Sequence, residues 1–248
     1  MNHLEHCAEL EVEIARFATI LETADPLGRV PSCPAWSIHD LAGHLGGIHR
    51  WAEYLVRVRS QVRMSSHDMG LDAGPPSAAW ILEGGTQLLV ALRSCDPDAP
   101  MWAWGADQHA RFWSRRQLHE TLMHRIDLEL AVGVEPRAAS VVAADGIDEF
   151  LVNLPFAATF SPGVRELTGS GSRLAFKQAD GDRRWVVVLG ERGISYVHDD
   201  VPADVELVAD TLELLLILYR RRQIDEADVS ITGDGELLRF WLARSALG

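Results

Sequence analysis

The residues in this chain best suited to chemistry are histidines and a carboxylate set at helical spacing. Glu120 and His124 are four positions apart, so on a helix they would project from one face, one turn apart. A carboxylate and an imidazole arranged in this way can share one cation. His119 and His124 are five positions apart, about 140° around a helix, which does not match the four-residue histidine spacing of zincin proteases.

His44 could complete a three-ligand site from a second helix. It lies four residues before Ile48 on an apolar face, and metal sites in helical bundles are built from side chains that point inward in this way. Together with Glu120 and His124 it would form the ligand set of a catalytic zinc site, which leaves one position for water or a thiolate. The alternative is a buried histidine that is hydrogen-bonded to a carboxylate, without any metal.

Other side chains near His44 have two possible roles each. Asp40, one turn earlier, could orient the His44 imidazole or only cap its own helix. Trp36 and Trp51 could line a pocket for a cofactor, although core packing explains a single tryptophan equally well. Cys33 lies in a loop and has no evident base to activate it.

Four amphipathic segments are expected to position these residues. Apolar residues recur every three or four positions through residues 4–21, 38–58, 77–92 and 111–132. Ser37, followed by Asp40, is a variant of the capping box, and Gly133 is suited to end the last segment. The Gly84-Gly85 pair should weaken or bend the third helix, unless a closely packed neighbour requires small residues. The pattern predicts a four-helix bundle.

The pattern changes near residue 135, and we therefore predict two domains, 1–135 and 136–248. A helix is expected through residues 147–154, and an Asp180-Gly181 turn is typical of a hairpin. The expected strands are 173–178, 184–189, 194–198, 205–208 and 229–232, and the expected final helices are 211–222, capped by Asp210 with Glu213, and 235–246. The predicted class is α+β, a four-helix bundle followed by a smaller α+β domain with an antiparallel sheet.

The composition excludes several classes of function. The 248 residues carry a net charge of −13, which would repel nucleic acid. No apolar run reaches the roughly 20 residues needed to cross a bilayer, and the N-terminus lacks a signal pattern. Cys7, Cys33 and Cys95 contain no CxxC pair, which is typical of a reducing compartment. We expect a cytoplasmic protein, monomeric or homodimeric, that acts on a small molecule and binds neither nucleic acid nor membrane.

Two stretches resemble the signature helices of the mycothiol-dependent maleylpyruvate isomerase family. One runs from Cys33 to Trp51 (CPAWSIHDLAGHLGGIHRW) and the other from His119 to Glu129 (HETLMHRIDLE). That family joins a DinB-like metal-binding four-helix bundle to a C-terminal α+β domain related in shape to sterol carrier protein. The resemblance implies that residues matching His44, Glu120 and His124 hold a divalent metal, usually zinc, although other divalent metals are possible. It also implies the thiol cofactor mycothiol.

The resemblance further implies an activity. A metal-bound mycothiol thiolate would add to an electrophilic, anionic small molecule, as in the cis–trans isomerisation of maleylpyruvate. The alternatives are a mycothiol S-transferase in detoxification or secondary metabolism and, from a different class, a non-catalytic metal-binding interaction module. Structural zinc sites usually have four protein ligands, which argues against the last alternative.

A family arginine at a Leu-Trp-Gly-Arg-like helix end is best matched here by Arg221. It lies within Leu218-Tyr-Arg-Arg-Arg222, where Arg220 replaces the usual small residue and the register leaves Arg220 and Arg222 open. An arginine fork would suit the carboxylates of the substrate. Three arginines at a helix C-terminus also complement the helix dipole without any substrate.

Overall fold

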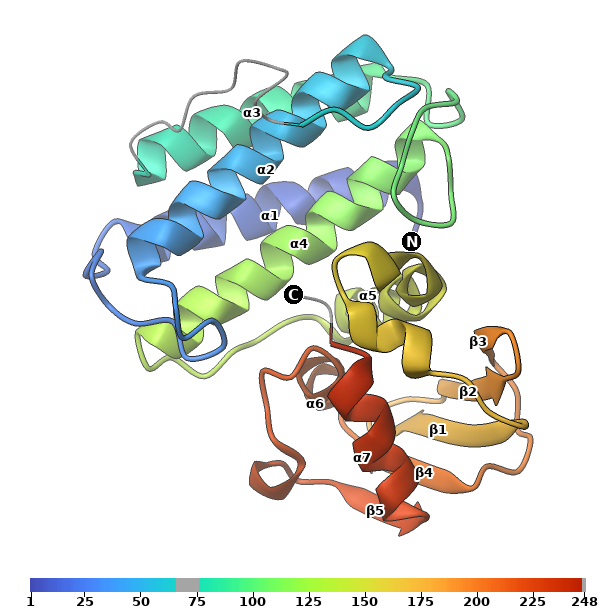
Figure 1. Cartoon of the computed structure of the whole chain (residues 1–248). Coiled ribbons are helices and arrows are strands. Elements are labelled where there is room, and N and C mark those ends of the chain that lie inside the picture. Colours follow the sequence, from blue (N-terminus) through green and yellow to red (C-terminus); the bar gives the residue numbers. More distant parts are fainter. Residues whose placement is uncertain (66–75, 247–248) are drawn as a thin grey trace. The chain divides into compact units, whose positions relative to one another are not determined.

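The structure is a computed structural model that describes residues 1–65 and 76–246 (Figure 1). The chain divides into two units, Met1–Arg137 and Ala138–Gly248, which are described separately below. None of the helices in the described ranges is long and apolar enough to cross a membrane.

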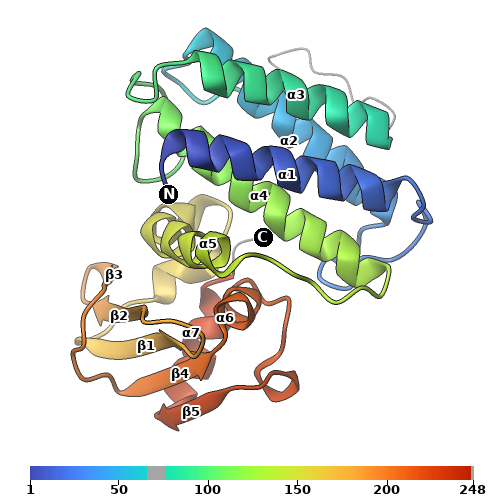
Figure 2. The same ribbon diagram turned by 180° about the vertical axis from the view of Figure 1, so that it is seen from behind.

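The first unit is a bundle of four helices, as predicted. They are α1 (His3–Leu21), α2 (Ile38–Val58), α3 (Ala78–Ser94) and α4 (Ala110–Ala131). Helix α1 packs against α3 and α4, and α2 packs against the same two helices from the other side (Figure 2). The apolar stripes of the helices meet in a common core, so α2 and α4 lie side by side and can contribute to one site.

Local sequence motifs set the ends of these helices. Ser37 and Asp40 form the reciprocal capping box of α2, and the Ser77 side chain caps α3 by accepting from the amide of Trp80. Gly133, two residues after α4, has a φ of +73°, which favours glycine because it lacks Cβ. The predicted cap of α2 at Ser37 and the predicted role of Gly133 are confirmed, and the bounds predicted for α3 and α4 differ from the observed ones by at most two residues.

The paired glycines of α3 serve close packing. A Cβ on Gly84 would lie 2.3 Å from Nη1 of Arg50, and one on Gly85 would lie 2.8 Å from Cδ1 of Ile14. Helix α3 continues through both positions. Of the two alternatives weighed from the sequence, close packing of neighbouring side chains is therefore the correct one.

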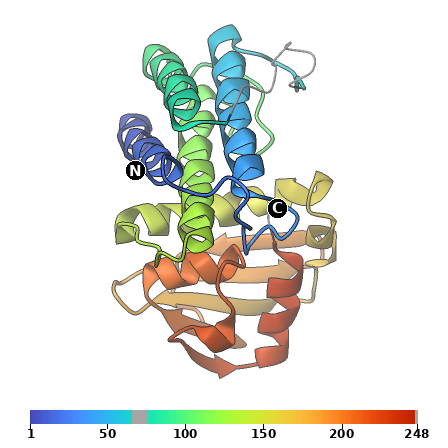
Figure 3. The same ribbon diagram turned by 90° about the vertical axis from the view of Figure 1, so that its left-hand side faces the viewer.

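The second unit is an α+β structure with a five-stranded sheet. Its elements are α5 (Ser140–Asn153), β1 (Ser172–Gln178), β2 (Arg184–Gly190), β3 (Gly193–Val197), β4 (Val205–Ala209), α6 (Thr211–Leu218), β5 (Ser230–Gly233) and α7 (Gly235–Arg244), with short 3-10 helices at Leu154–Thr159, Pro162–Glu166 and Ile224–Glu226. The strand order is β3-β2-β1-β4-β5, and the sheet is antiparallel except for the parallel pair β1 and β4. Helices α6 and α7 pack on strands of this sheet (Figure 3).

Helix α6 is shorter than predicted and is capped by a different residue. It ends at Leu218 rather than 222, because Arg220 has a φ of +60° and the amide of Arg221 donates back to the Leu216 carbonyl at 2.7 Å. The predicted cap, Asp210, makes no side-chain cap hydrogen bond. Instead, the Asp180 carboxylate accepts from the backbone amide and hydroxyl of Thr211, at 2.9 and 2.6 Å. A residue 31 positions away in the chain thus does the capping.

Candidate metal centre

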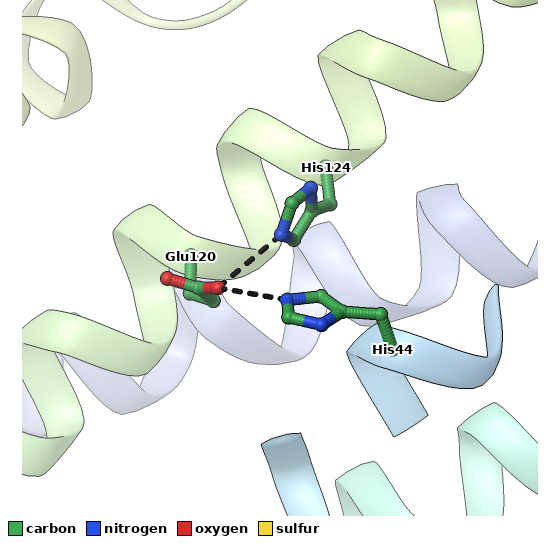
Figure 4. A group of neighbouring side chains, drawn as sticks. All are labelled: His44, Glu120 and His124. Atoms are coloured by element: carbon green, nitrogen blue, oxygen red, sulfur yellow. Dashed lines mark hydrogen bonds and ion pairs between the residues drawn. The ribbon is translucent and has the colours of Figure 1, made fainter. Parts of the chain in front are cut away.

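Three predicted ligands from two helices converge in the first unit (Figure 4). Oε1 of Glu120 lies 3.2 Å from Nε2 of His124 and 3.5 Å from Nε2 of His44. The three donor atoms all lie within 4.8 Å of one another. The packing of α2 against α4, which residue spacing alone does not reveal, places His44 opposite the Glu120 and His124 pair.

Arg116 holds the second oxygen of Glu120. It lies one turn earlier on α4, is almost fully buried, and donates from Nη2 to Oε2 of Glu120 at 2.7 Å. Burial alone would raise the pKa of the Glu120 carboxyl. The Arg116 cation and the hydrogen bonds from His124 and His44 outweigh burial and hold the pKa well below its usual range. Glu120 is therefore an anion with Oε1 directed at the two histidines.

His124 is held at its other ring nitrogen. Nδ1 of His124 lies 3.0 Å from Oδ2 of the fully buried Asp127. Burial alone would lower the pKa of His124, but the hydrogen bonds to Asp127 and Glu120 raise the pKa to about 9. A metal ion that binds here must displace a proton, because only a neutral imidazole is a ligand.

Trp36 lies against this group of ligands. Its ring centroid is 4.8 Å from that of His44 and 6.3 Å from that of His124. The two histidine rings meet edge to face at 4.9 Å. Trp36 is only partly exposed, so it forms an aromatic wall beside the three donor atoms.

Trp51 and Asp40 have other contacts. Trp51 donates from Nε1 to the Met64 carbonyl at 2.7 Å and packs on Trp102 and Trp113, with ring centroids 6.0 and 5.1 Å away. The carboxylate of Asp40 is exposed and accepts from the amide and hydroxyl of Ser37, at 2.9 and 2.6 Å. These contacts correspond to the packing and capping roles weighed for the two residues.

Arg221 belongs to the second unit. It follows α6, and its Nη1 donates to the Tyr219 carbonyl at 2.8 Å. Arg222, which also lies beyond the end of α6, has its Nε 3.1 Å from Oε1 of Glu213 in that helix.

Sequence reasoning missed the residues that hold the ligands. Arg116 and Asp127 lie four residues before Glu120 and three after His124, which are the spacings of helix neighbours, so this signal could have found them. Ser32 donates to Asp127 at 2.5 Å from a loop 95 positions away, and no local pattern reports such a contact.

The donor set fits a divalent cation. Two imidazole nitrogens and an ionised carboxylate oxygen converge. The second oxygen of Glu120 is paired with Arg116, and the second ring nitrogen of His124 is hydrogen-bonded to Asp127. Catalytic zinc sites use such a set of three protein ligands and leave the fourth position open. Imidazole and carboxylate ligands also accept other first-row divalent metals, so the set alone does not select zinc.

Comparisons with known proteins cover both units. A family model described as the mycothiol maleylpyruvate isomerase N-terminal domain matches residues 7–129, and one described as the MDMPI C-terminal domain matches residues 141–240. No curated protein matches the sequence of this chain.

Two solved structures share the fold. A crystal structure of the mycothiol-dependent maleylpyruvate isomerase aligns over 93% of this chain and 93% of its own, with 15% identity and a TM-score of 0.57. A histidine-to-alanine mutant of that isomerase aligns over 93% of each chain, with 14% identity and a TM-score of 0.58.

Proposed function

Since the chain belongs to the mycothiol-dependent maleylpyruvate isomerase family, we propose that it is a metal- and mycothiol-dependent enzyme that isomerises an electrophilic, anionic small molecule of the maleylpyruvate type. The observation that supports this most is the convergence of His44, Glu120 and His124 within 4.8 Å. The open fourth position of such a set suits a thiol sulfur.

A divalent cation, zinc by family resemblance, would supply positive charge that favours the ionised form of a thiol when it is bound. Residues around the candidate ligands hold those ligands in the charge state and orientation that metal binding requires. Arg116 keeps Glu120 ionised and directs Oε1 inward, while Asp127 keeps His124 with Nε2 inward. Trp36 screens one side of the ligands from water, which strengthens electrostatic interactions there.

The proposed reaction is a reversible addition to a polarised carbon–carbon double bond. Attack by the thiolate sulfur forms a carbon–sulfur bond and shifts the electron pair onto the conjugated carbonyl. Rotation about the resulting single bond and loss of the same thiolate then give the trans isomer, so no atom is gained or lost. An S-transferase would instead keep the carbon–sulfur bond, and the enolate formed by the addition would take up a proton from solvent in place of expelling the thiolate.

Arg221 is the proposed anchor for a substrate carboxylate. Its guanidinium presents a planar set of donors that matches a carboxylate. The cytoplasm is the proposed location, because Cys7, Cys33 and Cys95, all within the described ranges, form no disulfide, as is usual in a reducing compartment.

The test combines metal analysis with a thiol balance. The purified protein should hold close to one zinc ion, or another divalent metal, and His44→Ala should lose it. With maleylpyruvate, mycothiol should be required and not consumed if the enzyme is an isomerase, whereas a transferase would consume one thiol per turnover. Protein that binds neither metal nor mycothiol would contradict the proposal and favour an interaction module.

A further inference from the structure

One loop of the first unit contacts a candidate metal ligand with one side chain and the hydrogen-bond partner of a ligand with another. It runs from Val30 to Trp36 and is closed on itself, since the Val30 amide donates to the Trp36 carbonyl at 3.2 Å and the Trp36 amide donates to the Cys33 carbonyl at 2.8 Å. Trp36 lies against His44 and His124, as described above. Ser32, near the middle of the loop, makes the second contact, with Asp127 of α4.

Asp127 connects this loop to a metal ligand. Its side chain is fully buried, and its two oxygens have different partners: Oδ1 accepts from the Ser32 hydroxyl at 2.5 Å, and Oδ2 lies 3.0 Å from Nδ1 of His124. A buried carboxylate is tolerated only when such partners replace its hydration. Ser32, Asp127 and His124 therefore form one continuous chain of hydrogen bonds.

The chemistry of imidazole determines which nitrogen of His124 can bind a metal within this series of hydrogen bonds. When Nδ1 of His124 donates its hydrogen to Asp127, the neutral ring carries its lone pair on Nε2. Nε2 is the atom that faces Oε1 of Glu120 at 3.2 Å and belongs to the converging donor set. A carboxylate at the far side of a ligating histidine fixes the ring and raises its strength as a donor.

We propose that Asp127 and Ser32 are positioning residues that couple the Val30–Trp36 loop to the metal centre. Asp127 fixes the tautomer and the angle of His124, and Ser32 fixes Asp127 while holding the loop in place. Because coupling between two events is reciprocal, metal binding should also stabilise the loop that carries Trp36. This inference rests on the proposed metal site.

The first test measures zinc affinity without mycothiol or substrate, by competition with a chromogenic chelator. Asp127→Asn keeps the shape of the side chain but loses its charge, and its affinity should fall by about 10- to 100-fold. Ser32→Ala should lower the affinity about tenfold, near the bottom of that range, and Ser32→Thr should restore it because the hydroxyl returns. The control is Ser94→Ala, whose hydroxyl bonds the Val90 carbonyl on α3 and which should leave zinc affinity unchanged.

The second test separates positioning from general destabilisation. In nitrogen NMR of the zinc-loaded protein, His124 should carry its proton on Nδ1. Zinc should slow hydrogen exchange at the Cys33 and Trp36 amides of the wild type, and this effect should be lost in Ser32→Ala, a change in a partly exposed loop residue.

The outcomes distinguish this inference from the proposed function. Wild-type protein that binds no divalent metal would overturn both. If the wild type binds zinc but Asp127→Asn and Ser32→Ala stay within about twofold of it, far below the loss expected for such partners, the positioning role is wrong and the metal site stands. If zinc does not change hydrogen exchange at the Cys33 and Trp36 amides of the wild type, the proposed coupling between the loop and the metal centre is wrong.

Discussion

The two carboxylate oxygens of Glu120 have different surroundings: one pairs with an arginine of the same helix, and the other faces the centre of the candidate metal site. Oε2 is paired with Arg116 at 2.7 Å, and Oε1 faces the two histidines. Without metal, Arg116 is a permanent positive charge beside this mostly buried anion, whereas the neighbouring His124 is positive only while it is protonated. The pair therefore has a role before any metal binds, because it keeps the ligand ionised and oriented.

Replacing Arg116 by Met should destabilise the metal-free protein more than the zinc-loaded protein. Loss of one partner of a fully buried pair costs about 3–5 kcal/mol, and since Glu120 retains some exposure we expect about 2 kcal/mol. A bound cation would supply the missing positive charge and reduce this loss. Urea unfolding with EDTA and with saturating zinc measures both values.

Arg93→Met is the matched control for this substitution. Arg93 pairs with Glu11 at 2.6 Å on the surface, where an ion pair contributes less than about 1 kcal/mol. An equal loss in the two variants, or a loss at Arg116 that zinc does not reduce, would contradict the role given to Arg116.

His49 should make the fold sensitive to acid. It is fully buried on α2, with Nε2 2.9 Å from Oγ1 of Thr121, and burial lowers its pKa from 6.5 to about 3. Between pH 6.5 and about pH 3, His49 is protonated in the unfolded chain but stays neutral in the folded protein. The stability that depends on neutral His49 is therefore complete above pH 6.5 and falls as the pH decreases, by about 1.4 kcal/mol per pH unit.

Urea unfolding from pH 7 to 5 in EDTA checks this for the wild type and for His49→Gln, which keeps a polar group near Thr121. The variant should show a shallower dependence, by about one proton. His39→Gln is the control, because it makes the same substitution at an exposed position of the same helix and should leave the pH dependence of stability unchanged. Parallel pH profiles for the wild type and His49→Gln would show that another group causes the acid sensitivity.

At the scale of elements, α2 depends on two adjacent glycines with opposite surroundings. A Cβ on Gly46 would lie 1.9 Å from the Trp80 ring of α3, whereas one on Gly47 would meet nothing within 4 Å. Gly46 therefore sets the close approach of α2 to α3. Gly47 only weakens the helix, because glycine loses more backbone entropy than alanine.

Alanine at each position should change stability in opposite directions. Gly46→Ala should cost about 1–3 kcal/mol by overpacking, and Gly47→Ala should gain up to about 1 kcal/mol from helix propensity. Thermal or urea unfolding of the two variants gives the comparison directly. A stabilising Gly46→Ala would mean that Trp80 moves aside easily and that the close approach is not required.

The elements that the sequence predicted well are those whose ends are set by neighbouring residues. Ser37 with Asp40 caps α2 across three positions, and Gly133 ends α4 within its own turn. The errors at α6 have long-range or backbone causes: its cap comes from Asp180 on another connection, and Arg220 adopts the left-handed conformation usually left to glycine. The parallel pairing of β1 with β4 likewise depends on how distant strands meet, which local alternation does not report.

The same limit applies to the candidate site as a whole. Spacing on α4 predicted that Glu120 and His124 share a face, but only the packing of the bundle brings His44 to them. The contact between Ser32 and Asp127 spans 95 positions and has no sequence signature. Residues on one helix could thus be predicted as a set, whereas the partners that orient them required the tertiary structure.

At the scale of the whole molecule, Arg221 of the second unit is the residue proposed to bind the substrate carboxylate, whereas the three candidate metal ligands belong to the first unit. Arg221→Ala should therefore leave zinc content and mycothiol affinity unchanged and raise the KM for maleylpyruvate. Hydrogen bonds to a charged group contribute about 1.5–3 kcal/mol, which corresponds to a rise of about 10- to 100-fold. Arg221→Lys should restore little of this, because an ammonium lacks the planar fork.

Two comparisons make the assignment of Arg221 specific. Arg222 is held beside Glu213 of α6, and Arg220 is exposed, so Ala at either position should change the KM much less. An uncharged electrophile should react equally well with the wild type and Arg221→Ala, because it has no carboxylate to lose a partner. If Arg221→Ala instead lowered the affinity for mycothiol, or slowed the reaction of the neutral electrophile as much as that of the anionic one, Arg221 would not bind the substrate carboxylate. Its role would then be in binding the thiol or in stabilising the fold.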